Sequence, residues 1–469
     1  MIKIQLFLHF IFTLVITHTI SSQSMIGVWK GNLKTPAGEL PLILKVTEEG
    51  NETKTVLISP KQSPAEIPTL LKQHKSDSVT ITVRSLNIIY KGRLQNDRME
   101  GVFKQSEYTT PLTFIKTNAQ IAKPSPRKQD PKPPYPYISE QITFTNKNAG
   151  NIELSGTLTL PKEVKNPPVV ILISGSGPQD RNEEILNHRP FLILADHLTR
   201  RGIAVLRYDD RGTAKSEGVF KGAITSDFAS DVEAAVSFLT NRKDLSVSKI
   251  GLIGHSEGGL IAPMVASTNK EIKFIVLLAG PGVNGKEIIK SQTRKSQELA
   301  GTPESFISTN DQFMEIVLSE IIAEEDPVQT VQRIKNRTEA YHATLDTVLQ
   351  SQIPLQLIEK QAKQLANDPW MRNFLKSEPK NYLSQIKIPV LVLNGSKDIQ
   401  VIPELNLPAI KNILESSGNT DHTIKELEGL NHLFQKSETG ATSEYGTNEE
   451  TFNKEALQLI SDWVLEKSR

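Results

Sequence analysis

The sequence predicts an α/β protein with a mostly parallel sheet, helices on both faces and a helical cap, preceded by a small all-β domain. After residue 140, short apolar runs alternate with amphipathic stretches. One long helical stretch interrupts that alternation, and residues 25–118 instead show short strands separated by glycine turns. Continuous apolar strands that alternate with helices are typical of a parallel sheet covered on both faces.

The composition suits a soluble globular protein of two to three folding units, since the chain has 469 residues, 38% of them hydrophobic and 23% charged. The 54 Lys and Arg residues balance 53 Asp and Glu residues, which excludes a strong overall field for nucleic acid or an anionic membrane. Cysteine is absent, which excludes disulfides, cysteine-ligated metals and a cysteine nucleophile.

Residues 1–24 are expected to be a signal peptide. Lys3 precedes an apolar core over residues 6–16, and small polar residues follow. This core is short for the ~20 residues that a membrane span needs, and no other stretch is long enough to span. We therefore expect export to a bacterial periplasm or the exterior and no stable span after cleavage; an uncleaved anchor is the alternative.

Residues 25–118 predict a small barrel or sandwich, with strands near 42–46, 55–58, 79–83 and 88–90. Residues 27–30 and 101–104 have similar sequences, so they could be the first and last strands that meet in a closed barrel, although so short a likeness also arises by chance. Residues 119–139 hold six prolines and predict a Pro-rich linker that acts as a semi-rigid spacer.

Residues 140–469 predict the α/β domain. It opens with a hairpin over 142–144 and 154–160. The expected strands that follow are 169–173, 203–206, 250–253, 274–278, 390–393 and 424–427. The insertion at about 284–380 reads as helices and follows the carboxyl end of a strand, where ligands bind in open α/β sheets. We expect it to cap the site.

A Gly-x-Ser-x-Gly motif lies between a predicted strand and a predicted helix, with Ser256 at its centre. In that context the motif predicts a nucleophile elbow, in which the glycines permit a tight turn that exposes the serine. Asp398 follows a later strand and His432 follows the last one. The order Ser, Asp, His is the chain order of the triad found with this motif.

Backbone N–H groups near Ser256 are expected to form an oxyanion hole. The donors that we expect are Glu257, directly after the serine, and Ser176 in the glycine-rich turn after residue 173, with Gly175 as the next choice. Trp370 and Arg372, late in the cap, are candidates for a substrate pocket, with ordinary cap packing as the alternative. Asp180, Arg181 and Glu183 are expected to hold the loop by ion pairs, with substrate contact as the alternative.

Other residues compete for these roles. His255 lies within the elbow and His422 precedes the last strand, so both are less suited than His432. Asp209 and Asp210 follow an earlier strand and are expected to sit in a structural turn whose charges pair, with a second position for the catalytic acid as the alternative. The Gly-x-Gly-x-x-Gly pattern over 280–285 comes late in the sheet with proline in its turn, so we expect no nucleotide site there. The spacing of His, Asp and Glu residues resembles no metal site, and we expect no metal and no other cofactor.

The sequence resembles the α/β-hydrolase superfamily, and most of all bacterial exported esterases and serine-aminopeptidase-like (S33-type) hydrolases with an N-terminal β domain. The matching segments cover most of residues 140–469; they are LISGSGPQDRNE, LRYDDRGTAKSEG, IGLIGHSEGG, PWMRNFL, VLVLNGSKDIQV and GLNHLFQ. The resemblance implies cleavage of carboxylic esters through an acyl-enzyme, with Ser256 as nucleophile, His432 as base and Asp398 as the orienting carboxylate. A peptidase or amidase on the same triad, and a binding protein with a vestigial hydrolase domain, are the alternatives.

Overall fold

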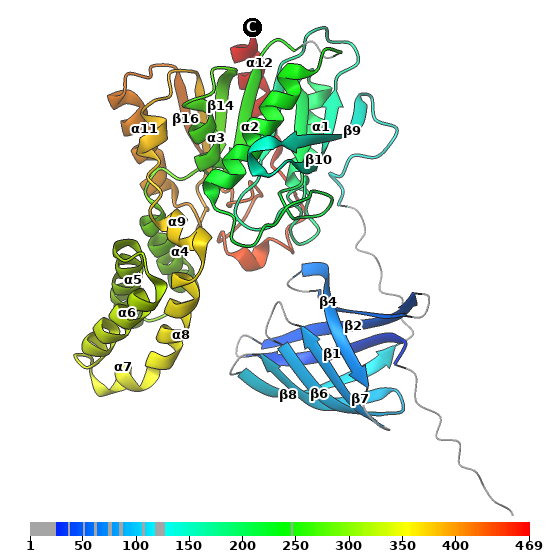
Figure 1. Ribbon diagram of the computed structural model, residues 1–469, viewed down its shortest axis with the longest axis vertical. Coiled ribbons are helices and arrows are strands. Elements are labelled where there is room, and N and C mark those ends of the chain that lie inside the picture. The colour runs from blue at the N-terminus through cyan, green and yellow to red at the C-terminus, as the bar shows by residue number, and fades with distance from the viewer. Residues whose placement is uncertain are drawn as a thin grey trace, which may run out of the picture. The chain divides into compact units, whose positions relative to one another are not determined.

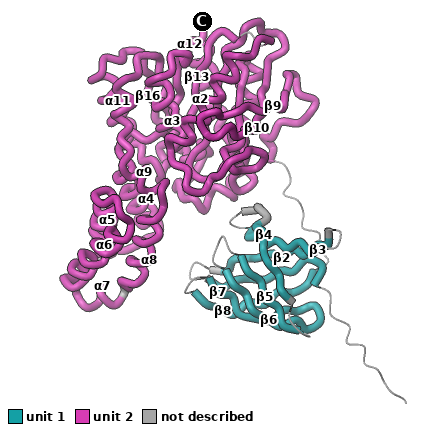
Figure 2. Tube along the Cα trace, in the orientation of Figure 1, with its two compact units in different colours: residues 1–125 teal, residues 126–469 magenta. Residues whose placement is uncertain are grey.

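The computed structural model describes residues 25–35, 38–49, 52–60, 63–73, 77–83, 88–105, 108–117, 127–244 and 247–469. They form two compact units, Met1–Ser125 and Pro126–Arg469, called here the barrel unit and the α/β unit (Figure 2). The predicted signal peptide, residues 1–24, and residues 119–126 of the predicted linker lie outside the described residues. Within the described ranges, no helix combines the length and the apolar character needed to cross a membrane.

The barrel unit is a closed barrel of eight antiparallel strands in sequence order. They are β1 (Gly27–Thr35), β2 (Gly38–Glu49), β3 (Glu52–Ser59), β4 (Ser63–Gln73), β5 (Ser78–Val83), β6 (Ile88–Gln95), β7 (Arg98–Gln105) and β8 (Tyr108–Thr117). Alternate side chains of β5 and β6 are buried, as a half-buried strand requires. Trp29, Leu44 and Met99 are fully buried in the interior, which side chains therefore fill.

The barrel closes through a strand other than the expected one. β1 pairs with β8, where Val28 lies opposite Thr117. The segment 101–104 belongs to β7, the last strand but one. Its likeness to residues 27–30 therefore does not mark the closing pair, because the further strand β8 follows it. The closed barrel itself confirms the small all-β domain.

The α/β unit holds an eight-stranded sheet in the order β16-β15-β14-β13-β11-β12-β10-β9. The strands are β9 (Ile138–Asn146), β10 (Ile152–Leu160), β11 (Val169–Ile173), β12 (Ala204–Tyr208), β13 (Ile250–His255), β14 (Ile272–Leu278), β15 (Val390–Gly395) and β16 (His422–Leu427). The hairpin β9–β10 is antiparallel, and β11 to β16 are parallel. This order confirms the predicted mostly parallel sheet.

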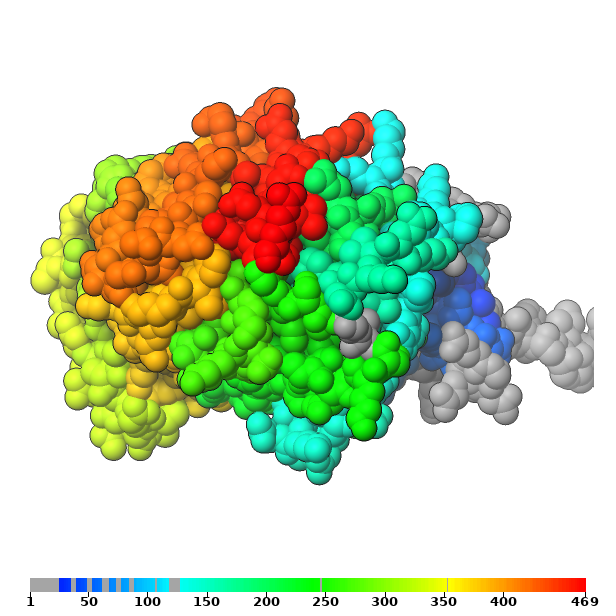
Figure 3. Space-filling view, turned by 90° about the horizontal axis from the view of Figure 1, so that it is seen from above, coloured from blue at the N-terminus to red at the C-terminus, as the bar shows by residue number. Residues whose placement is uncertain are grey.

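Helices cover both faces of this sheet (Figure 1). Apolar residues of α2, α3, α10 and α11 pack on one face, and those of α1 and α12 on the other. The space-filling view in Figure 3 shows the C-terminal residues, in red, at the surface of the α/β unit. The bounds are α1 (Pro190–Arg200), α2 (Thr225–Asn241), α3 (Gly258–Ala266), α10 (Lys380–Leu383), α11 (Pro403–Ser416) and α12 (Lys454–Ser468), with short turns η2 (Lys147–Ala149) and η3 (Thr442–Glu444).

The insertion between β14 and β15 is helical, and α4 to α10 are called here the cap. Besides α10, its helices are α4 (Gly285–Leu299), α5 (Glu304–Ala323), α6 (Pro327–His342), α7 (Thr347–Gln352), α8 (Leu355–Ala366) and α9 (Pro369–Leu375). Figure 1 shows α5 to α8 as an arm that extends beyond α4 and α9. The arm has an apolar core of its own, built around Leu318, Ile321 and Ala362. α4 and α9 pack on α3, where Ile288 and Phe374 contact Leu260.

The end of the proline-rich segment is bound to the α/β unit rather than extended away from it. The guanidinium of Arg127 donates to the carbonyl oxygens of Asn448, Gly446 and Leu186 over 2.8, 2.9 and 3.2 Å. The Tyr137 hydroxyl donates to Asp196 in α1 over 2.8 Å. These partly buried polar contacts explain why residues 127–137 pack with the α/β unit.

Candidate active site

Ser256 occupies a strained turn between β13 and α3. Its φ is +53°, a left-handed value that residues other than glycine rarely adopt, and its N–H donates to Leu278 O over 2.9 Å. A Cβ on Gly254 would lie 1.9 Å from Gly258 O, and one on Gly258 would lie 2.2 Å from Ile173 O. Only glycine fits at either position. The turn therefore has the local geometry that the Gly-x-Ser-x-Gly motif predicts.

Asp398 and His432 form a buried pair at the same edge of the sheet. Asp398 follows β15 and His432 follows β16, and the Nδ1 of His432 lies 2.8 Å from Asp398 Oδ2. Asp398 Oδ1 accepts the N–H groups of Gln400 and Val401 over 2.8 and 3.0 Å. Because the carboxylate takes Nδ1–H, Nε2 is the nitrogen of His432 that is left to accept a proton.

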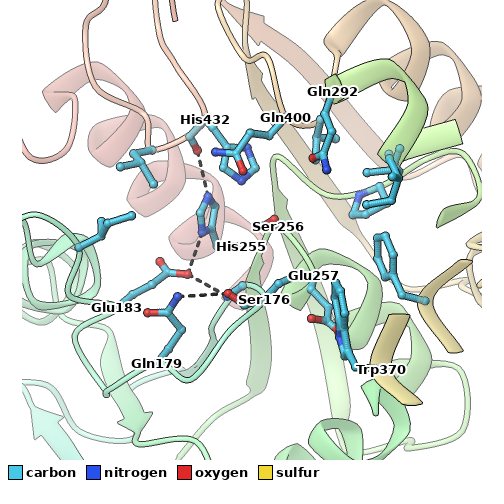
Figure 4. A pocket seen from close by; sticks show the side chains of 18 of the residues that line it. Ser176, Gln179, Glu183, His255, Ser256, Glu257, Gln292, Trp370, Gln400 and His432 are labelled. Atoms are coloured by element: carbon cyan, nitrogen blue, oxygen red, sulfur yellow. Dashed lines mark hydrogen bonds and ion pairs between the residues drawn. The ribbon is translucent and has the colours of Figure 1, made fainter. Parts of the chain in front are cut away.

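Ser256 and His432 line one cavity of about 320 Å³, beneath the cap (Figure 4). α4 and α9 supply an apolar wall, made of Ile288, Ile289, Trp370, Met371 and Phe374. Its polar lining includes Gln179, Gln292, Gln400 and Tyr445, which no sequence motif predicts. Glutamine and tyrosine carry no signal at these positions, because only the folded chain brings them together. A cavity of this size and mixed lining suits a small organic molecule.

The glycine-rich turn over residues 174–178, which holds the expected oxyanion donors, is called here the oxyanion turn. It lies directly against Ser256, since a Cβ on Gly175 would be 3.1 Å from the Cβ of Ser256. The Gly175 N–H, however, donates to Glu183 Oε1 over 2.8 Å, so it is not available to a substrate. This differs from its expected role, and the reason is that Glu183 folds back onto the turn. The N–H groups of Ser176 and Glu257 have no protein acceptor within the described part of the α/β unit. They remain the two candidate donors.

The side chain of Glu257 is buried and faces the cap. Its Oε1 accepts the Thr225 hydroxyl over 2.7 Å and the Trp370 indole N–H over 2.9 Å. Burial raises the pKa of the Glu257 carboxyl, while these donors act to lower it. Glu257 thus ties Trp370 in α9 to the residue after Ser256.

Arg372 is not among the cavity-lining residues, in contrast to Trp370. Its guanidinium donates to Ala366 O over 3.2 Å and to Glu324 O, and so joins cap helices to one another. Arg372 therefore follows the alternative of cap packing. The reason is its place on α9, where its side chain reaches the carbonyl ends of α5 and α8 rather than the cavity.

The charged residues of the neighbouring turns form pairs. Arg181 donates to Asp209 over 2.6 Å, and Arg211 donates to Asp231 over 2.8 Å. Asp210 accepts hydrogen bonds from the Ser174 hydroxyl and the Gln179 N–H, and so supports the oxyanion turn.

His422 starts β16, and its Nε2 lies 3.7 Å from Glu415. Within the described ranges, no three His, Asp or Glu side chains are grouped so as to hold a metal ion.

Comparison with known proteins gives the family. The family model described as X-Pro dipeptidyl-peptidase (S15 family) matches residues 118–409, more than half of the chain. The chain is 24% identical to the esterase EstD of Thermotoga maritima over 340 residues, 72% of each chain. It is 31% identical over 150 residues to the putative hydrolase YtaP of Bacillus subtilis, covering 28% of this chain and 50% of that protein.

Solved structures with similarity include the Pyrococcus furiosus esterase Pf2001, at 17% identity and a TM-score of 0.42, covering 71% of this chain and 92% of that one. A second is the proline iminopeptidase of Mycobacterium smegmatis, at 14% identity and a TM-score of 0.42, covering 70% and 99%. The strand order described above, rather than these structures, carries the fold assignment. The chain therefore belongs to the X-Pro dipeptidyl-peptidase (S15) family, and it is a hydrolase of the α/β-hydrolase superfamily with an N-terminal β-barrel domain.

Proposed function

We propose that the protein hydrolyses carboxylic esters of small molecules through an acyl-enzyme on Ser256. The observation that carries this proposal is the strained Ser256 turn, which opens on the same cavity as a histidine oriented by a buried carboxylate. A serine hydroxyl is a weak nucleophile until a neighbouring base removes its proton. His432 is the base in this proposal, and Asp398 fixes the ring so that Nε2 accepts that proton.

The proposed reaction has two stages, acylation of Ser256 and hydrolysis of the acyl-enzyme. Ser256 Oγ attacks the ester carbonyl carbon while His432 takes the hydroxyl proton, and the N–H groups of Ser176 and Glu257 stabilise the oxyanion. The C–O bond to the alcohol then breaks, and the alcohol leaves with the proton from His432. Water attacks the acyl-enzyme with His432 again as base, which releases the acid and restores Ser256.

The cavity supports an ester substrate over a peptide with a free amino terminus. A substrate ammonium needs a carboxylate that can receive it. Glu183 and Glu257 are the carboxylates among the described lining residues, and both are buried and already accept hydrogen bonds from protein donors. The other polar groups that line the cavity beside Ser256 and His432 include the neutral side chains of Gln292, Gln400 and Tyr445. The name of the Thermotoga relative agrees with an esterase.

The family description favours a second candidate, release of an X-Pro dipeptide from a peptide. To distinguish the two, turnover of p-nitrophenyl acetate is compared with that of an aminoacyl-proline p-nitroanilide. We expect the ester to be cleaved much faster and Ser256→Ala to abolish its turnover while the circular dichroism spectrum is unchanged. Retained ester turnover in Ser256→Ala would exclude Ser256 as the nucleophile, and preference for the amide would favour the peptidase.

A further inference from the structure

His255, which precedes Ser256 in the motif, contacts oxygen atoms on both sides of its ring. Its Nδ1 lies 2.8 Å from Glu183 Oε1, and its Nε2 lies 2.9 Å from the main-chain oxygen of His432 (Figure 4). The side chains of His255 and Glu183 are 8% and 6% exposed, so neither contact is with a group that water screens freely. Proton positions here follow from the chemistry of the partners.

These partners place a proton on Nε2 and offer a hydrogen-bond acceptor to Nδ1. A carbonyl oxygen only accepts, so Nε2 of His255 must carry a proton. Glu183 Oε1 already accepts the Gly175 N–H over 2.8 Å, which marks it as an acceptor for Nδ1–H as well. The geometry suits an imidazolium that donates from Nδ1 to Glu183 Oε1 and from Nε2 to the main-chain oxygen of His432. Burial acts to lower the pKa of His255, but the Glu183 carboxylate and the His432 carbonyl together raise it.

This pair joins three parts of the site. Glu183 holds the oxyanion turn through Gly175, His255 belongs to the Ser256 turn, and its Nε2–H holds the main chain of His432. The ring centroids of His255 and His432 lie 4.8 Å apart. His432 is thus fixed at its ring by Asp398 and at its main chain by His255.

We propose that Glu183 and His255 are a positioning pair, which sets the oxyanion turn and the His432 loop against Ser256 and takes no part in the bond changes at the substrate. The inference rests on the proposed function, since it assigns the pair to the alignment of those three groups. Small misplacements of reacting groups can cost about 10²-fold in rate. The pair is therefore expected to affect kcat more than KM.

Glu183→Gln is the most informative single variant. An amide at this position cannot accept from both Gly175 N–H and a protonated His255 without leaving an uncompensated buried charge. If its NH₂ group turns to a neutral His255, the Gly175 N–H loses its acceptor. Either outcome disturbs one of the two hydrogen bonds at Glu183 Oε1, to Gly175 N–H or to His255. His255→Gln removes the other half of the pair, and the double variant closes the cycle.

The test measures kcat and KM for p-nitrophenyl acetate in both single variants and the double variant. We expect each single variant to lower kcat about 10²-fold with KM within about threefold. The double variant is expected to be no slower than the slower single one, because both changes break one unit. Unchanged kcat in folded single variants, or effects that multiply in the double variant, would overturn the proposal.

A matched control separates positioning from stability. Glu320 is a buried carboxylate in the cap, paired with Arg333 and Arg337, and does not line the cavity. Glu320→Gln should lower the thermal midpoint as Glu183→Gln does, but leave kcat within about twofold. If Glu183→Gln loses no more kcat than this control at the same stability, the role of Glu183 is structural only and the proposal fails.

The protonation of His255 can be read without activity. In protein with ¹⁵N-labelled histidine, the signals missing from His255→Gln belong to His255. We expect both ring nitrogens to be protonated at neutral pH. A spectrum with one protonated nitrogen would overturn the pair even if ester hydrolysis at Ser256 is established. Loss of the proposed function would instead appear as full activity in Ser256→Ala, so the two failures are distinct.

Discussion

The indole Nε1–H of Trp370, in cap helix α9, donates to Oε1 of Glu257 over 2.9 Å. Trp370 also stacks on Phe374, with ring centroids 5.0 Å apart. The cap is thereby bonded to the residue whose main-chain N–H is a proposed oxyanion donor. A change in the cap at this point should therefore reach the chemistry.

Trp370→Phe keeps an aromatic ring but removes the N–H donor. Because Glu257 is buried, loss of a donor should lower the free energy of unfolding by about 1–3 kcal/mol. We expect kcat/KM for an ester to fall about tenfold as the elbow loses its support. Urea unfolding and steady-state kinetics measure the two effects.

Trp463→Phe is the matched control, since the Nε1 of buried Trp463 has no hydrogen-bond partner within the described residues. It should lose packing only and keep its kcat/KM. An equal loss of activity in both tryptophan variants would show that the bond to Glu257 is not what matters.

Asp210 supports the oxyanion turn and should make stability depend on pH. Burial raises its pKa to about 8, although Gln179 N–H and the Ser174 hydroxyl act to lower it. The unfolded chain loses this proton near pH 4 and the folded chain only near pH 8. Unfolding therefore releases a proton between these values, and stability falls as pH rises through that window.

Asp210→Asn stays neutral in both states and should lack this slope. The free energy of unfolding of the wild type, relative to Asp210→Asn, should fall by up to about 1.4 kcal/mol per pH unit between pH 4 and pH 8. Urea titrations at three pH values test this. Asp244→Asn is the control. The hydrogen bond from Arg242 holds the pKa of exposed Asp244 below its usual range, so Asp244 should add no slope to the stability between pH 4 and pH 8. Parallel pH curves for the wild type and Asp210→Asn would contradict the prediction.

Much of the site could be predicted because its signals are local. The glycines beside Ser256 report a turn that no larger residue fits, and Asp398 and His432 follow strands that apolar runs identify. The parallel order then brings the three strand ends to one edge. The closed barrel was predicted as one of two options, since short alternating strands suit both a barrel and a sandwich.

The remaining features depend on contacts between distant residues. Glu183 and His255 are 72 positions apart, and nothing in either segment signals a buried pair. The role of Gly175 could not be predicted either, because its N–H donates to Glu183, eight residues later in the chain. Arg372 lies two residues after Trp370, but helical geometry directs the two side chains differently. Such distinctions need the packed structure.

Arg127 connects two loops that border the cavity. Its guanidinium binds Leu186 O beside Ile185 and Gly446 O beside Tyr445, and both Ile185 and Tyr445 line the cavity. Arg127→Ala leaves these carbonyls without a donor. We expect the free energy of unfolding to fall by about 1–3 kcal/mol and KM for an ester to rise.

Lys128→Ala is the control for that variant. Lys128 pairs with Glu449 at the surface, where its side chain is 83% exposed. A surface pair of this kind contributes little, so stability and KM should stay near wild-type values. If Arg127→Ala behaves like Lys128→Ala, the end of the proline-rich segment does not support the cavity.

The most direct test of the central claim is to trap the acyl-enzyme. The protein is mixed with p-nitrophenyl acetate, quenched in acid within the first turnover, digested and mapped by mass spectrometry. We predict a burst of p-nitrophenol and an acetyl group on Ser256, both absent in Ser256→Ala. Ester turnover with no acetylated peptide, or with the acetyl group on another residue, would contradict the account.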